Sequence, residues 1–138
     1  MLKEIKIKGY KSIKDITLDL KPINILIGAN GVGKSNFITF FSLVNNIYEQ
    51  NLQNYTMACG ADSLLYYGLK HTNFIEGSLD FGNNTYSFKL APARDGSLYI
   101  SEESNIYKNS RLIYPIKNIR DSKIKDSSRT RDSFLRNF

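Results

Sequence analysis

Apolar and polar side chains alternate at the start of the chain and predict two β-strands. Leu2, Ile5 and Ile7 stand between charged residues, and the segment from Gly9 to Ser12 interrupts this pattern. The alternation then resumes from Ile13 to Leu20 and stops at Pro22. Because successive side chains of a strand point to opposite faces, the period of two predicts an antiparallel pair of strands with one apolar face.

The next two segments lack this alternation. The apolar run Ile23–Ile27 carries no charge, which predicts a third strand at the buried centre of a sheet. Apolar residues then recur at spacings of three and four from Asn36 to about Tyr48, which predicts a helix. Its predicted buried stripe is Phe37, Phe40, Phe41, Val44 and Ile47 or Tyr48, and its predicted outer face is Thr39, Ser42, Asn45 and Asn46.

After the helix the pattern predicts a small antiparallel meander. We expect the polar stretch 49–56 to end the helix, and a short helix or turn within 58–69. Period-two segments then predict strands near 75–81, 85–90 and 98–100, the last ended by Glu102 and Glu103. Turn-forming residues at 82–84 and 94–97 separate these strands.

The boundary between the apolar run and the helix carries the chemistry. It reads Gly28-Ala29-Asn30-Gly31-Val32-Gly33-Lys34-Ser35, which fits the phosphate-loop pattern G-x-x-x-x-G-K-[ST]. Strand, glycine-rich turn and helix are the context that this loop requires. A glycine-rich turn that binds nothing is the alternative, but Lys34 and Ser35 in phase with the glycines argue against it.

Each residue type has a role in holding a triphosphate. The glycines allow the backbone to turn tightly at positive φ, so that the amides from about Asn30 to Ser35 point inward as donors. Lys34 is expected to reach the β- and γ-phosphates, and the Ser35 hydroxyl to ligate Mg²⁺. The sequence therefore predicts a binding site for ATP with Mg²⁺.

Charge is spread unevenly along the 138 residues. Residues 1–110 carry 11 Lys and Arg against 10 Asp and Glu, whereas residues 111–138 carry 8 against 3. We expect an ATP-binding lobe over 1–116 and a basic tail, or the start of a further segment, over 117–138. Such a tail can meet nucleic acid or an acidic partner, or it can be a solvated surface.

Other residue types exclude several function classes. The single cysteine, Cys59, cannot form an internal disulfide, and we expect it to be a small buried hydrophobe in a reducing compartment. The single histidine, His71, is expected in a turn, and a zinc site is not indicated. The N-terminal segment has no apolar core of signal-peptide length, and no apolar stretch reaches membrane-spanning length, so a cytoplasmic location without membrane contact is expected.

Two segments together resemble a known family. The run from Ile5 to Asp15 and the run from Gly28 to Asn36 resemble the start of ABC-type ATPases of the SMC and RecF kind. They resemble most closely the bacterial AAA family ATPase group that includes phage-defence and overcoming-lysogenisation proteins. Residues 60–68 and 77–82 are also similar to that group, so the similarity covers roughly 1–110.

The resemblance implies an α/β P-loop NTPase fold. It implies an incomplete domain, the N-terminal lobe of an ABC-type ATPase, with an antiparallel sheet and one main helix after the loop. Lys11 and Ser12 match positions that often lie near the nucleotide phosphates in this family, although an ordinary exposed turn fits them equally. The implied partners are ATP, a second copy or a C-terminal ATPase lobe, and DNA.

Parts of the family pattern are absent from this sequence. It has no apolar run that ends in Asp-Glu, no Leu-Ser-Gly-Gly-like signature and no switch histidine, and Gln50 and Gln53 stand too early for the Q-loop. In the family these parts lie in a C-terminal lobe, so we expect a truncated, split or degenerate member. Hydrolysis needs a positioned water as well as a phosphate cradle. This chain by itself is therefore expected to bind ATP weakly and to hydrolyse it poorly, with no catalytic residue of its own.

Two other readings stay open. A nucleic-acid-binding or scaffold module with a vestigial loop would suit the basic tail. A small P-loop kinase would suit the loop alone, but kinases usually open with one strand before it, whereas two strands are expected here.

Overall fold

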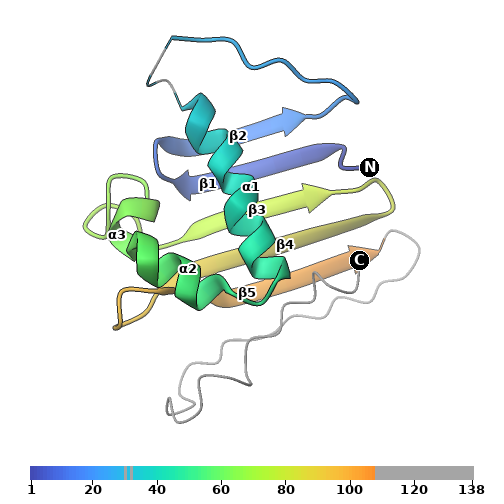
Figure 1. Ribbon diagram of the computed structural model, residues 1–138. Helices are drawn as coiled ribbons and strands as arrows, with labels where there is room; N and C mark the ends of the chain where they lie inside the picture. Colours follow the sequence, from blue (N-terminus) through green and yellow to red (C-terminus); the bar gives the residue numbers. More distant parts are fainter. Residues whose placement is uncertain (30, 32, 108–138) are drawn as a thin grey trace.

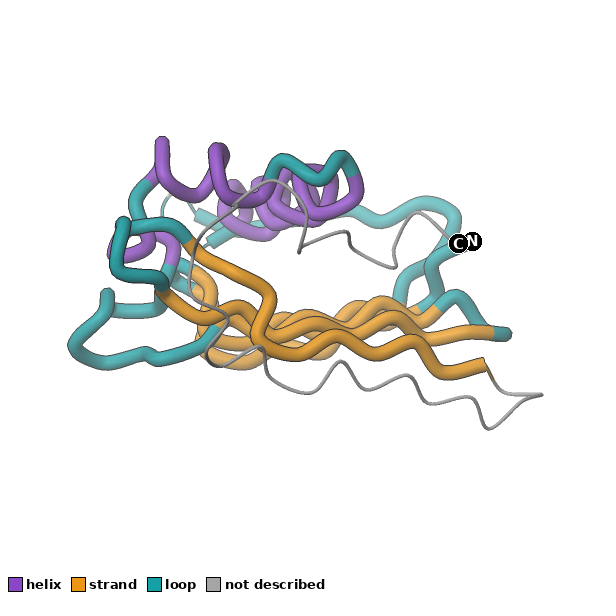
Figure 2. Tube along the Cα trace, turned by 90° about the horizontal axis from the view of Figure 1, so that it is seen from below, coloured by secondary structure: helices purple, strands orange, loops and turns teal. Residues whose placement is uncertain are grey.

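The computed structural model describes residues 1–29, 31 and 33–107, which form a five-stranded antiparallel sheet with helices on one face (Figures 1 and 2). The spatial order of the strands is β2-β1-β3-β4-β5. Their bounds are β1 Glu4–Tyr10, β2 Ile13–Asp19, β3 Ile75–Asp80, β4 Asn84–Pro92 and β5 Leu98–Tyr107. The long connection from β2 to β3 contains every helix of the described residues, so the phosphate-loop segment belongs to the layer that covers the sheet.

The predicted strand pairs are confirmed. β1 and β2 form an antiparallel hairpin in which Ile7 pairs with Ile16, and β3, β4 and β5 form the meander. The expected end of the last strand at Glu102 and Glu103 is wrong, because β5 continues to Tyr107. Glu102 lies opposite Lys89, and Glu103 accepts a 2.5 Å hydrogen bond from the Tyr86 hydroxyl, so neither carboxylate ends the strand.

Three helices of the described residues form the covering layer, and the sequence pattern did not predict the second of them. α1, Lys34–Tyr48, confirms the predicted helix. The polar stretch 49–56 ends α1, as expected, but it also begins a second helix, α2, Leu52–Cys59, in which Leu52 and Thr56 one turn apart are both buried. α3, Ala61–Leu64, lies within the segment expected to hold a short helix or turn.

The predicted buried stripe of α1 is confirmed in part. Phe40 and Ile47 are buried against the sheet, and Phe37 and Val44 pack partly against the core. Phe41 is wrong, because it is 38% exposed and Leu43 is buried in its place, and Tyr48 is 42% exposed. Spacings of three and four do not distinguish between two adjacent stripes when apolar residues occupy both.

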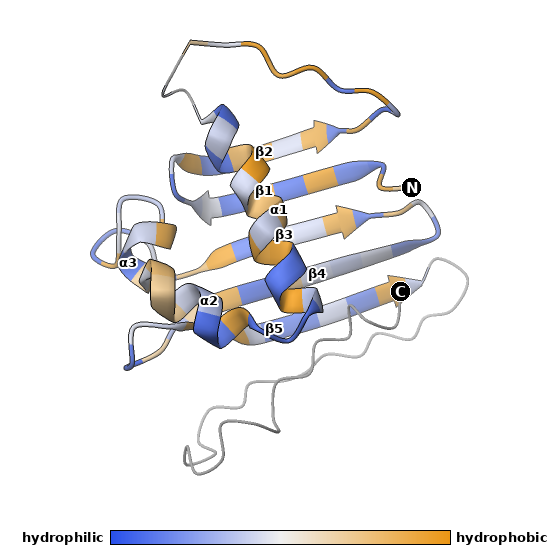
Figure 3. Ribbon diagram, in the orientation of Figure 1, coloured by the Kyte–Doolittle hydropathy of each residue, from blue (hydrophilic) through white to orange (hydrophobic). Residues whose placement is uncertain are grey.

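The predicted strand Ile23–Ile27 is wrong. These residues form an irregular segment that arcs away from the sheet, and Ile23, Ile25 and Ile27 are 82%, 79% and 90% exposed (Figure 3). A buried strand needs a hydrogen-bonded neighbour on each side. Among residues 1–29, 31 and 33–107 no strand pairs with this run, so its apolar side chains face solvent.

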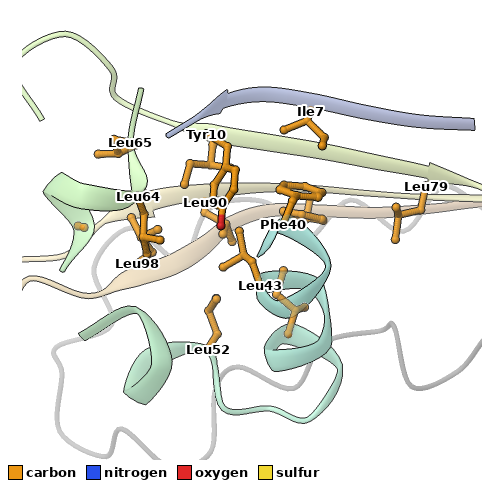
Figure 4. Packing of buried hydrophobic residues seen from close by; sticks show 14 of the residues in the cluster. Ile7, Tyr10, Phe40, Leu43, Leu52, Leu64, Leu65, Leu79, Leu90 and Leu98 are labelled. Carbon is orange, nitrogen blue, oxygen red and sulfur yellow. The ribbon is translucent and has the colours of Figure 1, made fainter. Parts of the chain in front are cut away.

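The core lies between the sheet and the helices. Phe40 and Leu43 of α1 point toward Ile7 of β1, Leu79 of β3 and Leu90 of β4 (Figure 4). At one end Leu52 of α2, Leu64, Leu65 and Leu98 close the same cluster around Tyr10. This packing fixes α1 on the sheet and so fixes the position at which the helix begins.

The opposite face of the sheet is polar, as expected when one side of an antiparallel sheet meets water. Across the five strands Asp15, Lys8, Glu76, Lys89 and Glu102 stand next to one another in register, with alternating sign. Lys8 lies 4.0 Å from Asp15, and Lys89 lies 3.5 Å from Glu76. Opposite charges in neighbouring strands each add modest stability and help to fix the register.

Two single-residue expectations have different outcomes. Cys59, expected to be buried, is exposed at the end of α2. His71 lies in an exposed turn, as expected. The expected tail 117–138 lies outside the described residues.

Candidate phosphate-binding site

The predicted phosphate loop leads directly into α1. Gly31 and Gly33 have φ values of +85° and +103°, a backbone region that residues with a Cβ rarely adopt. Gly33 is the N-cap of α1, and its carbonyl accepts the first helical hydrogen bond, from the Phe37 amide. The glycines therefore turn the chain sharply at the beginning of the helix.

The N-terminus of α1 is open to an anion. The first turn, which the structure describes in full, carries no acidic residue, and its N-cap, Gly33, has no side chain that could cap the amides. The first amides of a helix have no partner within the helix, and the helix dipole places partial positive charge there. An anion bound at this turn would accept hydrogen bonds from these amides and would be attracted by the partial positive charge. Ser35 lies in this turn and is exposed.

Lys34 folds back across the loop. Its Nζ donates hydrogen bonds to the carbonyl oxygens of Gly28 and Ala29, the latter at 2.7 Å. The ammonium group is thus held at the mouth of the loop by two neutral acceptors and not by a carboxylate. Phosphate oxygens are stronger acceptors for an ammonium group than carbonyls, because a charged acceptor strengthens the hydrogen bond.

The turn between β1 and β2 lies against the start of α1. The Asn36 side-chain amide donates a 2.7 Å hydrogen bond to the Ser12 hydroxyl. A Cβ on Gly33 would lie 3.0 Å from the same hydroxyl. The structure therefore brings Ser12, Gly33 and Asn36 together, although Ser12 lies more than twenty residues before them in the sequence.

Lys11 is directed along the helix. Its backbone has a φ of +48°, and its Nζ lies 3.4 Å from the Thr39 hydroxyl and 5.5 Å from the centre of the Tyr10 ring. The Tyr10 hydroxyl also contacts the Thr39 hydroxyl, at 3.1 Å. The Lys11 ammonium group thus contacts α1 more than one turn after the helix begins at Lys34.

Thr39 was missed as part of this site. The sequence pattern predicts it on the outer face of the helix, but it is half-buried and contacts both Tyr10 and Lys11. Its position one turn after Asn36 was a usable signal, because residues three apart share a helix face. Asn30 and Val32, two predicted loop residues, lie outside the described residues.

Among the described residues no group of His, Cys, Asp and Glu side chains is arranged to hold a metal ion. Over the same residues, no helix is both long enough and apolar enough to cross a membrane.

The sequence of this chain is similar to a known protein family and to a known nuclease. A family model described as AAA ATPase domain matches residues 1–129. An OLD nuclease from Thermus scotoductus is 36% identical over 44 residues, which are 32% of this chain and 8% of the nuclease. The matched part is thus a small fraction of that relative, whereas the family match covers nearly the whole chain.

Proposed function

Since the chain belongs to the AAA ATPase domain family, we propose that it binds ATP with Mg²⁺ through the loop Gly28–Ser35. The observation that carries the proposal is the ammonium group of Lys34, held over the loop by Gly28 and Ala29 at the uncapped start of α1. The proposed nucleotide-binding residues are Gly28, Asn30, Gly31, Val32, Gly33, Lys34, Ser35, Asn36, Lys11 and Ser12.

The proposed role of each loop residue follows from the hydrogen-bond donors and metal-binding oxygens that it offers. Backbone amides at the start of α1 and Lys34 would bind the β- and γ-phosphates. The Ser35 hydroxyl would supply one oxygen to Mg²⁺, which keeps most of its waters and takes the rest of its ligands from the phosphates. Lys11 and Ser12 would extend the cradle from the β1–β2 turn.

Titration calorimetry tests the proposal. Mg-ATP should bind the chain, and Lys34→Ala should weaken binding at least tenfold, because the variant loses a charge-assisted hydrogen bond. Lys21→Ala is the matched control, since Lys21 is an exposed lysine beyond the end of β2. Equal binding by the wild-type and Lys34→Ala chains would overturn the proposal, as would no binding by either.

A second measurement addresses the metal. Ser35→Ala should lower the affinity for ATP in the presence of Mg²⁺ and leave the affinity in excess EDTA nearly unchanged. The hydroxyl acts only through the ion, so the two conditions separate its role from general damage to the loop. An equal loss in both conditions would contradict a role as metal ligand.

We further propose that hydrolysis requires groups that this chain does not carry. The sequence has no apolar run that ends in Asp-Glu and no signature motif, so a base and a second charge-stabilising group must come from another lobe or a second copy. The exposed run Ile23–Ile27 supports this, because an unpaired apolar segment beside the loop is suited to cover by a partner.

The hydrolysis proposal has a direct test. Phosphate release from the chain alone should be far slower than the typical enzyme range, which begins near 1 s⁻¹. Turnover at ordinary enzyme rates, abolished by Lys34→Ala, would refute it. Transfer of phosphate to a metabolite would instead favour a kinase, and salt-sensitive DNA binding without ATP binding would favour a nucleic-acid module. A cytoplasmic location and roles in DNA maintenance or phage defence stay predictions.

A further inference from the structure

The aromatic side chain of Tyr67, in the loop after α3, does not contribute to the hydrophobic core. Tyr67 is 74% exposed, more than Phe41, Tyr48 or Phe74, the other exposed phenylalanine and tyrosine residues of the described chain. Its backbone φ is +54°, a region that a bulky residue rarely adopts. Residues held in sparsely populated backbone conformations cluster at binding and active sites.

The ring of Tyr67 is held in place by other rings. Its centre lies 4.4 Å from that of Tyr66, with the planes at 76°, and 6.4 Å from that of His71, with the planes at 72°. Both contacts are of the edge-to-face kind. Three aromatic rings thus form a small exposed cluster in the loop that follows α3.

The backbone of this loop is fixed at several points. The Asp62 carboxylate accepts a 2.9 Å hydrogen bond from the Leu69 amide, and the Thr72 hydroxyl donates to the carbonyl of Tyr66. Gly68 has a φ of +80°, a region that favours glycine, and a Cβ there would lie 2.7 Å from Asp62 Oδ1. The cluster is therefore preorganised, which lowers the entropy lost when a ligand binds.

The same loop is hydrogen-bonded to the strand end that leads to the phosphate loop. The Tyr66 amide donates to the Gly9 carbonyl at 2.9 Å, and the Lys11 amide donates to the Leu64 carbonyl at 2.8 Å. The next residue, Ser12, contacts Asn36 at the start of α1. Figure 1 shows this loop and the β1–β2 turn at the same end of the strands.

These contacts join the aromatic cluster to the start of α1 through the β1–β2 turn. The loop that carries Tyr67 is hydrogen-bonded to one side of this turn, and Ser12 of the same turn is hydrogen-bonded to Asn36.

We propose that Tyr67, supported by Tyr66 and His71, is the stacking surface for the base of the nucleotide. This inference rests on the proposed function, because it needs the phosphates at Gly28–Ser35. Stacking on an aromatic ring tolerates any base, since every base presents a π face. The chemistry recognised at this subsite is an aromatic heterocycle joined to a polyphosphate.

The test compares Mg-ATP with Mg-tripolyphosphate, which lacks the base and the sugar. Tyr67→Gly removes the ring and suits the positive φ, so the loop should keep its fold. The variant should bind Mg-ATP about 5- to 100-fold more weakly than the wild type. Its affinity for Mg-tripolyphosphate should equal that of the wild type, and Tyr67→Phe should restore ATP affinity.

The controls separate this inference from the proposed function. Tyr48→Ala removes an exposed ring at the far end of α1, about 20 Å from the loop, and should change neither affinity. Lys34→Ala should weaken both ligands. Equal ATP affinity for Tyr67→Gly and the wild type, or equal losses for both ligands, would overturn the stacking role alone. Failure of the wild-type chain to bind either ligand would overturn both proposals.

Discussion

Tyr10 joins the end of β1 to the first turns of α1. Its ring packs edge-to-face on Phe40 at 5.2 Å, and its hydroxyl contacts the Thr39 hydroxyl. The residue is fully buried, and this burial raises the pKa of its phenol to about 12, because the charged phenolate would lose its hydration. One side chain thus couples the sheet to the helix that carries the phosphate loop.

This pKa predicts a specific loss of stability in alkali. The folded chain holds the Tyr10 proton more tightly than the unfolded chain, whose tyrosine titrates near the ordinary value of about 10. The contribution is complete below about pH 10 and is lost as the pH rises through about 12. Denaturant titrations between pH 9 and pH 12 should show this fall, with a total on the order of 1–3 kcal/mol.

Tyr10→Phe provides the comparison. It should be less stable than the wild type near pH 8, by about 1 kcal/mol, because the contact with Thr39 is lost. Its stability should nevertheless fall less steeply above pH 10. Parallel pH profiles for the two chains would show that Tyr10 does not cause the alkaline loss.

At the scale of elements, the approach of α1 to the sheet depends on Gly77 in β3. A Cβ at this position would lie 2.3 Å from Phe88 Cζ and 2.9 Å from Phe40 Cζ. The rings of Phe40 and Phe88 stack at 6.1 Å directly above this glycine. The absence of a side chain in β3 therefore makes room for the contact between α1 and β4.

Gly77→Ala should accordingly destabilise the fold. Overpacking a filled core costs about 1–3 kcal/mol, which lowers the melting temperature by several degrees. Ser78→Ala is the matched control on the other face of the same strand, where it removes a hydroxyl contact with Ser87 and should cost less, about 0.5–1 kcal/mol. Calorimetric melting of both variants checks the order, and a Gly77→Ala chain as stable as the wild type would contradict this packing.

The sequence predicted some helices and strands correctly and others not. The β1–β2 hairpin, the meander and α1 follow from periodicity, because each has its packing partners within the described residues. The run Ile23–Ile27 was misassigned, since composition reports that a segment is suited to burial and not whether a neighbour is present to bury it. In the site, Lys34 and Ser35 follow from the motif, but Thr39 and Tyr67 acquire their positions only through tertiary contacts.

At the scale of the whole molecule, several apolar side chains outside the sheet are exposed. Ile23, Ile25 and Ile27 are largely exposed in the segment that precedes the loop, and Ile38 on the outer face of α1 is 60% exposed. Exposed apolar surface of this kind is suited to contact with a partner. The family match and this surface together are consistent with an incomplete N-terminal lobe.

Replacing two of these side chains tests the interpretation. Ile25→Ser with Ile27→Ser should change the free energy of unfolding by less than about 1 kcal/mol, because neither side chain is buried. The same variant should bind less of a hydrophobic dye and self-associate less in sedimentation experiments. Ile7→Ser, at a fully buried position, should instead cost several kcal/mol. A large loss of stability in the double variant would mean that the run packs within the free chain.

The strand order has a consequence for synthesis on the ribosome. β1 pairs with β3 across a long stretch of chain, with Ile7 opposite Gly77, and Phe40 rests on Phe88. The hairpin β1–β2 and the helix α1 therefore leave the ribosome well before the strands on which they pack. Until β3 and β4 have emerged, α1 has little surface on which to bury its apolar face. The phosphate loop, although encoded early, is thus assembled late, when the meander closes against β1.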